Sequence, residues 1–237
     1  MKKASENNPW IVFGGWGFQP RLLEPVFGGD AHYVDTVSLI PSLVAGGNLR
    51  SDWISRLASW ADDCLPRPPR RVAGWSTGSL VATALSLGGT VSRMVLLSAT
   101  ARFCSGDARA PGQPPAVVRT MLRKMRRDPA RVLREFRALC EPPEPSTRLR
   151  EQPPDELADG LRFLEQADLL PVLEDAVPAE VFHGENDKVI PAAAGRMVAE
   201  RTKGRFMSMP GGHLFFLSSG PAIAATIRHP EASARQS

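Results

Sequence analysis

Cysteine is scarce in this sequence, and long apolar runs are absent. The three cysteines, Cys64, Cys104 and Cys140, are odd in number and widely spaced, which excludes a disulfide framework and a clustered zinc site. No run of about 18 apolar residues occurs, and the polar start of the chain has no apolar segment of signal-peptide length. The sequence therefore predicts a cytoplasmic protein with buried or idle thiols, no metal or other cofactor, and no membrane span.

Acidic residues are scarce in one part of the chain. The net charge is +4, but between residues 117 and 140 eight lysines and arginines face only Asp128 and Glu135. That stretch carries +6, and the rest of the chain therefore carries −2. Such a stretch suits an acidic protein partner. A solvated basic face, a nucleic-acid surface and a membrane surface are the alternatives.

Short apolar runs alternate with helical patterns, as in a single α/β domain. A length of 237 residues and an apolar content of 43% suit one domain with an insertion. This alternation predicts a mostly parallel sheet flanked by helices. We expect strands over residues 10–13, 33–39, 72–73, 91–98, 179–183 and 205–209, and helices over residues 51–64, 79–87, 115–127, 129–139, 155–170, 191–201 and 221–228.

The strand signal disappears between residues 100 and 170. The apolar spacing there is helical, and a proline-rich linker spans residues 141–154. We therefore predict a core made of residues 1–99 and 171–237, with a helical cap of residues 100–170 inserted after a central strand. The sequence says little about oligomeric state, and we expect a monomer.

The sequence Gly74-Trp75-Ser76-Thr77-Gly78 joins a predicted strand to a predicted helix. In a G-x-S-x-G turn the serine has a strained backbone, and its hydroxyl stands above the end of the strand. Glycines are needed on both sides because a side chain there would collide across so tight a turn. The pattern alone is weak, and a glycine-rich turn with a solvated serine is the alternative. In this context we interpret Ser76 as a nucleophile.

Two further polar residues follow predicted strands. Asp187 comes after the fifth strand and His213 after the sixth, so both are expected at the sheet edge that holds Ser76. His213 would take the proton from Ser76, and Asp187 would stabilise the resulting imidazolium. Glu185 is the alternative acid, and the other three histidines fit the role of base less well. The sequence therefore predicts a Ser-His-Asp triad.

Acyl transfer also needs backbone N–H donors for the oxyanion. Thr77, directly after the serine, is one candidate. The loop of residues 14–17 after the first strand can supply the second, because its glycines let the backbone approach a ligand closely. Trp16 is the best candidate in that loop. An ordinary turn with a packed indole is the alternative.

Together these motifs resemble the α/β-hydrolase superfamily, in which Ser, Asp and His follow one another in this order. The likeness is greatest to the pimeloyl-[acyl-carrier protein] methyl ester esterases of biotin synthesis, and it covers residues 10 to about 220. The motifs that carry it are Phe13-Gly14-Gly15-Trp16-Gly17, Gly74-Trp75-Ser76-Thr77-Gly78, Gly184–Asp187, Gly212-His213, Arg102-Phe103 and Arg131–Leu139.

The resemblance implies a serine carboxylesterase. Ser76 would attack the methyl ester of a pimeloyl chain that is carried on the acidic acyl-carrier protein. Cap arginines hold the carrier in that family, and Phe136 is a candidate wall of the acyl tunnel, with helix packing as the alternative. The candidate carrier-binding residues are Arg119, Arg123, Arg127, Arg131 and Arg134.

Departures from the family pattern leave the subfamily open. Gly14 stands where the family usually has histidine, Ser79 replaces a frequent glycine, and we expect the N-terminal antiparallel hairpin to be missing. Another small-acyl esterase or thioesterase of the same fold is one alternative function. A non-catalytic protein of this fold that binds an acidic partner is another.

Overall fold

The structure is a computed structural model that describes residues 8–44, 52–106, 111–140 and 152–229. Most of the predicted linker at residues 141–154 lies outside these ranges. The centre is one six-stranded sheet in the order β2-β1-β3-β4-β5-β6, and every neighbouring pair of strands is parallel. The strands are β1 (Trp10–Phe13), β2 (His32–Val34), β3 (Arg70–Trp75), β4 (Val91–Leu97), β5 (Ala179–Gly184) and β6 (Arg205–Met209).

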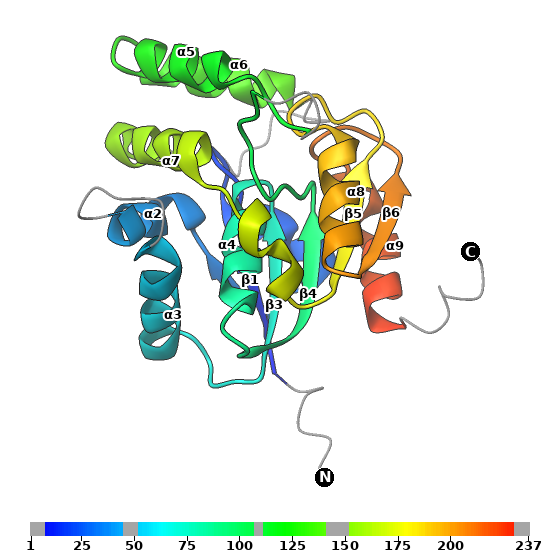
Figure 1. Cartoon of the computed structure of the whole chain (residues 1–237). Helices are drawn as coiled ribbons and strands as arrows, with labels where there is room; N and C mark the ends of the chain where they lie inside the picture. Colours follow the sequence, from blue (N-terminus) through cyan, green and yellow to red (C-terminus); the bar gives the residue numbers. More distant parts are fainter. Residues whose placement is uncertain (1–7, 45–51, 107–110, 141–151, 230–237) are drawn as a thin grey trace.

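Helices cover both faces of the sheet (Figure 1). Two of them are 3₁₀ helices, η1 (Pro20–Leu23) and η2 (Leu170–Asp175). The others are α1 (Glu24–Phe27), α2 (Thr36–Val44), α3 (Asp52–Cys64), α4 (Thr77–Ser86), α5 (Pro115–Met125), α6 (Pro129–Leu139), α7 (Pro154–Gln166), α8 (Ala192–Arg201) and α9 (Phe216–Arg228). The predicted fold class is thus confirmed.

The central strands form because they are apolar on both faces, as buried parallel strands require. All four residues of β1 and the last four of β4 are buried. Every residue of α4 is buried as well, since this helix packs on β1, β3 and β4. The residues that precede and follow the central turn at Ser76 therefore lie in the core. In the described part of the chain no antiparallel strand joins the sheet.

The α-helices α5, α6 and α7, which lie between β4 and β5 in the chain, cover the end of the sheet where the strands finish (Figure 1). α5 packs on α6 and α7, and α7 packs on α2. α6 begins at a proline, and the Asp128 carboxylate caps it by accepting a hydrogen bond from the backbone N–H of Arg131 at 2.9 Å. The placement of these helices fits a cap, whose limits at residues 100 and 170 stay a prediction.

The predicted strand over residues 33–39 is wrong in its second half, because β2 ends and α2 begins on either side of Asp35. The Asp35 carboxylate caps the helix, accepting hydrogen bonds from the backbone N–H groups of Val37 at 3.1 Å and Ser38 at 3.4 Å. The β-branched residues Thr36 and Val37 favour a strand locally. Their burial in α2, together with the Asp35 cap, outweighs that preference.

Two helical segments also differ from the prediction. The segment from η1 to α1, between β1 and β2, was not predicted. α9 begins at Phe216, and Pro221 lies inside it instead of starting it. The earlier start reflects packing, because the rings of Phe216 and Trp75 lie 5.1 Å apart in the core. The helix preferences of the local sequence could not predict that contact, because the two rings lie far apart in the chain.

Candidate active site

Ser76 stands at the sharp turn between β3 and α4. Its φ of +57° lies in the left-handed region, which a residue with a side chain rarely occupies. The backbone N–H of Ser76 donates to the Leu97 carbonyl at 3.1 Å and holds the turn. A Cβ atom at Gly74 would overlap with the Gly78 carbonyl, and one at Gly78 would overlap with the Phe13 carbonyl. Both glycines of the motif are therefore sterically required.

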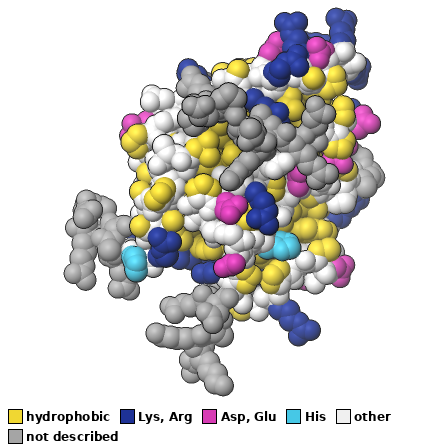
Figure 2. All heavy atoms as spheres, turned by 180° about the vertical axis from the view of Figure 1, so that it is seen from behind, with side chains coloured by type: hydrophobic (Ala, Val, Ile, Leu, Met, Phe, Trp, Pro, Cys, Tyr) yellow, Lys and Arg dark blue, Asp and Glu magenta, His cyan; other side chains and the backbone are white. Residues whose placement is uncertain are grey.

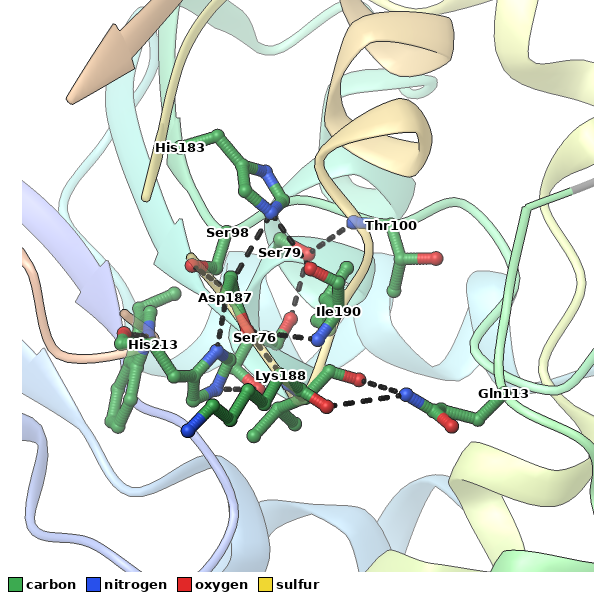
Figure 3. Close-up of polar contacts among 12 residues, drawn as sticks. Ser76, Ser79, Ser98, Thr100, Gln113, His183, Asp187, Lys188, Ile190 and His213 are labelled. Carbon is green, nitrogen blue, oxygen red and sulfur yellow. Dashed lines mark hydrogen bonds and ion pairs between the residues drawn. The ribbon is translucent and has the colours of Figure 1, made fainter. Parts of the chain in front are cut away.

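Ser79 supports the same turn from within α4. Its hydroxyl donates to the Ser76 carbonyl at 2.6 Å and accepts from the backbone N–H of Thr100 at 3.2 Å (Figure 3). A glycine, which the resemblance leads one to expect here, would make neither hydrogen bond. The departure from the family pattern thus joins the serine turn to the segment that follows β4.

Three side chains from different strand ends contact one another in succession (Figure 3). Ser76 follows β3, Asp187 follows β5, and His213 follows β6. Nε2 of His213 lies 3.0 Å from Oγ of Ser76, and Nδ1 lies 2.8 Å from Oδ2 of Asp187. Because an ionised carboxylate only accepts hydrogen bonds, Nδ1 carries the imidazole proton, and Nε2 is left to accept from the hydroxyl. This is the geometry a general base needs.

Asp187 is held by four hydrogen bonds. Besides the bond from His213, Oδ2 accepts from the Ser98 hydroxyl at 2.7 Å, and Oδ1 accepts from the backbone N–H groups of Val189 at 2.8 Å and Ile190 at 2.9 Å. Burial alone would raise the pKa of this carboxyl, but the nearby His213 and the hydrogen bonds prevail and lower the pKa from 3.8 to about 2. Asp187 is therefore ionised at neutral pH and can stabilise a cation on His213.

Comparison with known proteins identifies the family of this chain. The sequence profile described as "Alpha/beta hydrolase family" matches residues 13–226. The chain belongs to the alpha/beta hydrolase family. An esterase structure from Exiguobacterium antarcticum matches this hydrolase with a TM-score of 0.75 at 18% identity, over 98% of this chain and 92% of that one. At that identity the match shows the shared fold.

Curated relatives of this hydrolase are also similar over most of their length. The pimeloyl-[acyl-carrier protein] methyl ester esterase of Stenotrophomonas maltophilia strain R551-3 is 31% identical over 92% of this chain and 91% of its own. The protein of the same name from Aromatoleum aromaticum is 28% identical, over 81% of this chain and 84% of its own. Both matches therefore include the serine turn and the cap helices.

Two residues that contact the predicted triad were not themselves predicted. Ser98, whose hydroxyl reaches Asp187, has a φ of +45° directly after β4. Trp75 donates from Nε1 to the His213 carbonyl at 3.2 Å, and the two rings lie 5.2 Å apart. A polar residue directly after a buried apolar strand was the signal for Ser98. Trp75 lies inside the motif, but no local feature shows that it contacts the histidine.

His183 lies behind Asp187 and is fully buried (Figure 3). Its Nε2–H donates to the Ile190 carbonyl at 3.0 Å and lies 3.5 Å from Oδ2 of Asp187. Nδ1 has no hydrogen-bond partner within the described ranges, and it faces Gly195, where a Cβ atom would overlap with it. Burial lowers the pKa of His183, and the opposing effects of the Ile190 carbonyl and Asp187 are smaller. His183 is therefore neutral and fixes the turn that carries Asp187.

The two predicted oxyanion donors flank Ser76. Thr77 is the first residue of α4, where backbone N–H groups have no partner within the helix. Trp16 lies in the loop after β1, and both residues line the same cavity as Ser76. The indole Nε1 of Trp16 donates to the Leu157 carbonyl at 2.8 Å, so the ring is fixed beneath α7. The backbone N–H groups of Thr77 and Trp16 stay the predicted donors.

The space next to Ser76 is small and apolar. Its volume is about 20 Å³, close to the space that one water molecule needs. Met121 and Phe136 are among its walls, and both also line an apolar groove of about 490 Å³ between α5 and α6. Phe136 therefore lies between the groove and the cavity, and its role as a wall of an acyl tunnel stays a prediction. Its ring also packs on Trp16 at 4.9 Å between ring centres.

The five predicted carrier-binding arginines are exposed. Two lie on α5, two on α6 and one in the turn between them: Arg119, Arg123, Arg131, Arg134 and Arg127. Arg119 forms an ion pair with Glu165 of α7 at 2.6 Å, and Arg131 pairs with Glu135 at 2.7 Å. Part of the positive charge is thus offset within the cap.

A surface hollow of about 410 Å³ at the end of α5 is lined by four basic side chains, Arg123, Lys124, Arg126 and Arg127. Lys124 and Arg126 were not among the predicted carrier-binding residues. Figure 2 shows basic side chains projecting at the upper end of the molecule, where Figure 1 places the turn between α5 and α6. Part of the excess positive charge predicted from the sequence therefore lies on the surface at the end of α5.

The described residues also answer three other questions, which concern metal-binding clusters, membrane-spanning helices and reactive cysteines. They hold no cluster of His, Cys, Asp and Glu that could bind a metal ion, and none of their helices is long and apolar enough to cross a membrane. Cys64 is exposed, whereas Cys104 and Cys140 are buried. Burial raises the pKa of the Cys104 thiol to about 11, so Cys104 does not form a thiolate that competes with Ser76.

Proposed function

We propose that this hydrolase is a serine carboxylesterase that cleaves the methyl ester of a pimeloyl chain carried on acyl-carrier protein. The observation that carries the proposal is the continuous chain of contacts from Ser76 through His213 to Asp187. The names of the curated relatives support the substrate. In this proposal residues 100–170 form the cap, and the arginines of the cap bind the acidic carrier.

The geometry suggests the course of the reaction. Oγ of Ser76 attacks the ester carbonyl while Nε2 of His213 takes its proton, and Asp187 stabilises the imidazolium. The oxyanion accepts hydrogen bonds from the N–H groups of Thr77 and Trp16, aided by the positive end of α4. His213 then protonates the methoxide oxygen, and methanol leaves. Water that His213 deprotonates attacks the acyl-serine, which releases the acid and restores Ser76.

Three adjoining spaces of the cap lie in the order that a carrier-bound chain needs. Thr120 and Lys124 line both the basic hollow and the apolar groove. Met121 and Phe136 line both that groove and the cavity at Ser76. An acidic carrier at the hollow would therefore place its arm along the groove, with the ester toward the serine. Electrostatic attraction between the two surfaces would speed their encounter.

Replacing Ser76 tests the chemistry. Ser76→Ala should abolish methanol release from the carrier-bound methyl ester, because loss of a triad serine can cost on the order of 10⁶ in rate. The turnover of p-nitrophenyl butyrate should fall with it, while the melting temperature stays close to that of the wild type. Full turnover in Ser76→Ala would show that the assignment is wrong. Growth of a biotin-requiring strain that lacks its own esterase tests the pathway.

Charge reversal in the basic hollow tests the carrier. We expect Arg123→Glu with Arg127→Glu to lower kcat/KM for the carrier-bound ester about tenfold at low salt, and less at high salt. The turnover of p-nitrophenyl butyrate should not change. Arg201→Glu is the control, because Arg201 lies on α8 and pairs with Glu174 at 3.1 Å. An equal loss with both substrates would contradict docking at this hollow.

A second candidate, an esterase for shorter acyl chains, is favoured by the small cavity at Ser76. A series of p-nitrophenyl esters from acetate to octanoate separates the two. Under the main proposal, kcat/KM rises with chain length, since each buried methylene adds apolar contact. A maximum at acetate would favour the second candidate.

A further inference from the structure

The loop after β1 supplies one predicted oxyanion donor, and its own sequence gives it little rigidity. Gly14, Gly15 and Gly17 surround Trp16, and Gly17 has a φ of +77°. Glycine restricts the backbone least of all residues. The backbone N–H of Gly14 donates to the Val34 carbonyl at 3.2 Å, which holds the beginning of the loop. The position of the Trp16 N–H therefore depends on contacts from other parts of the chain.

One set of contacts comes from α6. Nε of Arg137 donates to the Gly17 carbonyl at 2.9 Å, and its guanidinium carbon lies 5.6 Å from the centre of the Phe18 ring. Leu133, one turn earlier on the same helix, packs so closely that a Cβ atom at Gly17 would lie 2.8 Å from its Cδ1. α6 thus contacts the end of the loop through a hydrogen bond, a cation–π contact and packing.

A second set of contacts comes from α7. The Trp16 indole donates to the Leu157 carbonyl at 2.8 Å. Gly160, one turn later, leaves room for the ring, since a Cβ atom there would lie 2.7 Å from Cδ1 of Trp16. The edge-to-face contact with Phe136 of α6 completes the enclosure. Two of the cap helices, α6 and α7, therefore hold the loop at the neighbouring residues Trp16 and Gly17.

We propose that Arg137 is a positioning residue for the oxyanion hole, with the Trp16 indole as the second anchor. Arg137 fixes the Gly17 carbonyl, and the indole fixes Trp16 itself, so the Trp16 N–H keeps its direction toward the oxyanion. This inference rests on the proposed function, because it needs Ser76 as nucleophile. A misplacement of about 1 Å at a reacting centre can cost about 100-fold in rate. Arg137 therefore acts on the chemical step without touching the substrate.

Arg137→Met tests this, because it keeps an unbranched apolar side chain and removes the donor. We expect kcat for p-nitrophenyl butyrate to fall roughly 10- to 100-fold, with KM changed less than about twofold. The Ki of an alkyl boronic acid, which forms a tetrahedral adduct on serine, should rise by the same factor as kcat/KM falls. Arg137→Lys, which keeps a donor, should restore most of both values.

Arg162→Met is the matched control, because Arg162 lies on α7 and pairs with Asp159 on the same helix. It should change neither kcat nor Ki. If Arg137 served stability alone, Arg137→Met would lower the melting temperature and the fraction of enzyme that reacts with a fluorophosphonate. The Ki of the remaining active enzyme would then equal the wild-type value, which would overturn the proposal.

Trp16→Phe is the second variant, and it decides if Arg137→Met does not fold. It keeps the backbone N–H and a ring but removes the indole donor, so the same fall in kcat and rise in Ki are expected. Unchanged kcat and Ki in the variants that fold would refute the positioning role, provided that Ser76→Ala abolishes turnover. Retained turnover in Ser76→Ala would instead refute the proposed function and this inference together.

Discussion

Replacing Asp187 by asparagine reverses the hydrogen-bond polarity of one atom at the site. Oδ1 accepts from two backbone N–H groups at 2.8 and 2.9 Å, whereas Oδ2 faces Nδ1 of His213 at 2.8 Å. In Asp187→Asn the amide oxygen must stay with the two N–H groups. Turning it away would leave two buried donors facing an NH₂ group, at a cost of roughly 1–3 kcal/mol for each. The NH₂ group therefore faces His213.

That orientation inverts the tautomer of the base. Nδ1 of His213 must accept from the amide, so the imidazole proton moves to Nε2. Nε2 lies 3.0 Å from Oγ of Ser76, and once protonated it cannot take the hydroxyl proton. In the serine protease triad this substitution lowers kcat about 10⁴-fold, which corresponds to about 5.5 kcal/mol. We expect a loss of that order here, with the ring still in place.

The assay combines kinetics with a direct observation of the proton. The turnover of p-nitrophenyl butyrate gives kcat, and nitrogen-15 NMR of the imidazole shows which ring nitrogen is protonated. Asp168→Asn is the control, because Asp168 is an acid outside the triad that pairs with Arg102 at 3.2 Å, and it should keep wild-type kcat. A persistent Nδ1–H signal in Asp187→Asn, or a kcat above about a tenth of wild type, would refute this reasoning.

Three further predictions concern stability. In Gly78→Ala the new Cβ overlaps with the carbonyl at the end of β1, so urea unfolding should show a free energy of unfolding lower by about 3 kcal/mol. Gly88→Ala is the control and should lose much less, because its Cβ has its nearest neighbour at 3.7 Å. Equal losses in the two variants would contradict the steric argument. The pKa of Asp187 is lowered to about 2 in the folded protein. The ionised carboxylate therefore contributes stability above pH 4, and this contribution is lost as the pH falls toward 2. Each tenfold decrease in the proton affinity of the carboxylate on folding corresponds to about 1.4 kcal/mol of stability. Acid unfolding followed by circular dichroism should therefore show a smaller pH dependence in Asp187→Asn than in the wild type. His183→Leu leaves the Ile190 carbonyl without its donor, and the free energy of unfolding should fall by roughly 1–3 kcal/mol; no change in urea unfolding would show that this hydrogen bond adds nothing.

The meeting of Ser76, His213 and Asp187 could be predicted from the sequence for a simple reason. Each follows a short apolar run that ends in a turn, and parallel strands bring their carboxyl ends to one edge. Neither the register nor the packing had to be known. The glycines of the serine turn were equally predictable, because the crowding at Gly74 and Gly78 is local to the turn.

Contacts across the fold could not be predicted in this way. The hydroxyl of Ser98 reaches Asp187 only because β4 and β5 are neighbours in a particular register. The contact of Arg137 with Gly17 depends on the direction in which α6 lies over the sheet. Asp35 misled the prediction differently, since its helix cap and the burial of Thr36 and Val37 together outweighed the strand preference of those two residues. Periodicity shows which face of an element is apolar, but not which neighbour that face meets.

Met121 and Phe136 lie between the groove of the cap and the cavity at the serine, because both residues line both spaces. Methionine has three rotatable bonds, and an aromatic ring can swing about two. Under the proposed function, the room for an acyl chain can therefore change by rotamer exchange alone, while Ser76, His213 and Asp187 and the strands that carry them stay still. Selection for a different chain length could act at these two positions without altering the catalytic apparatus.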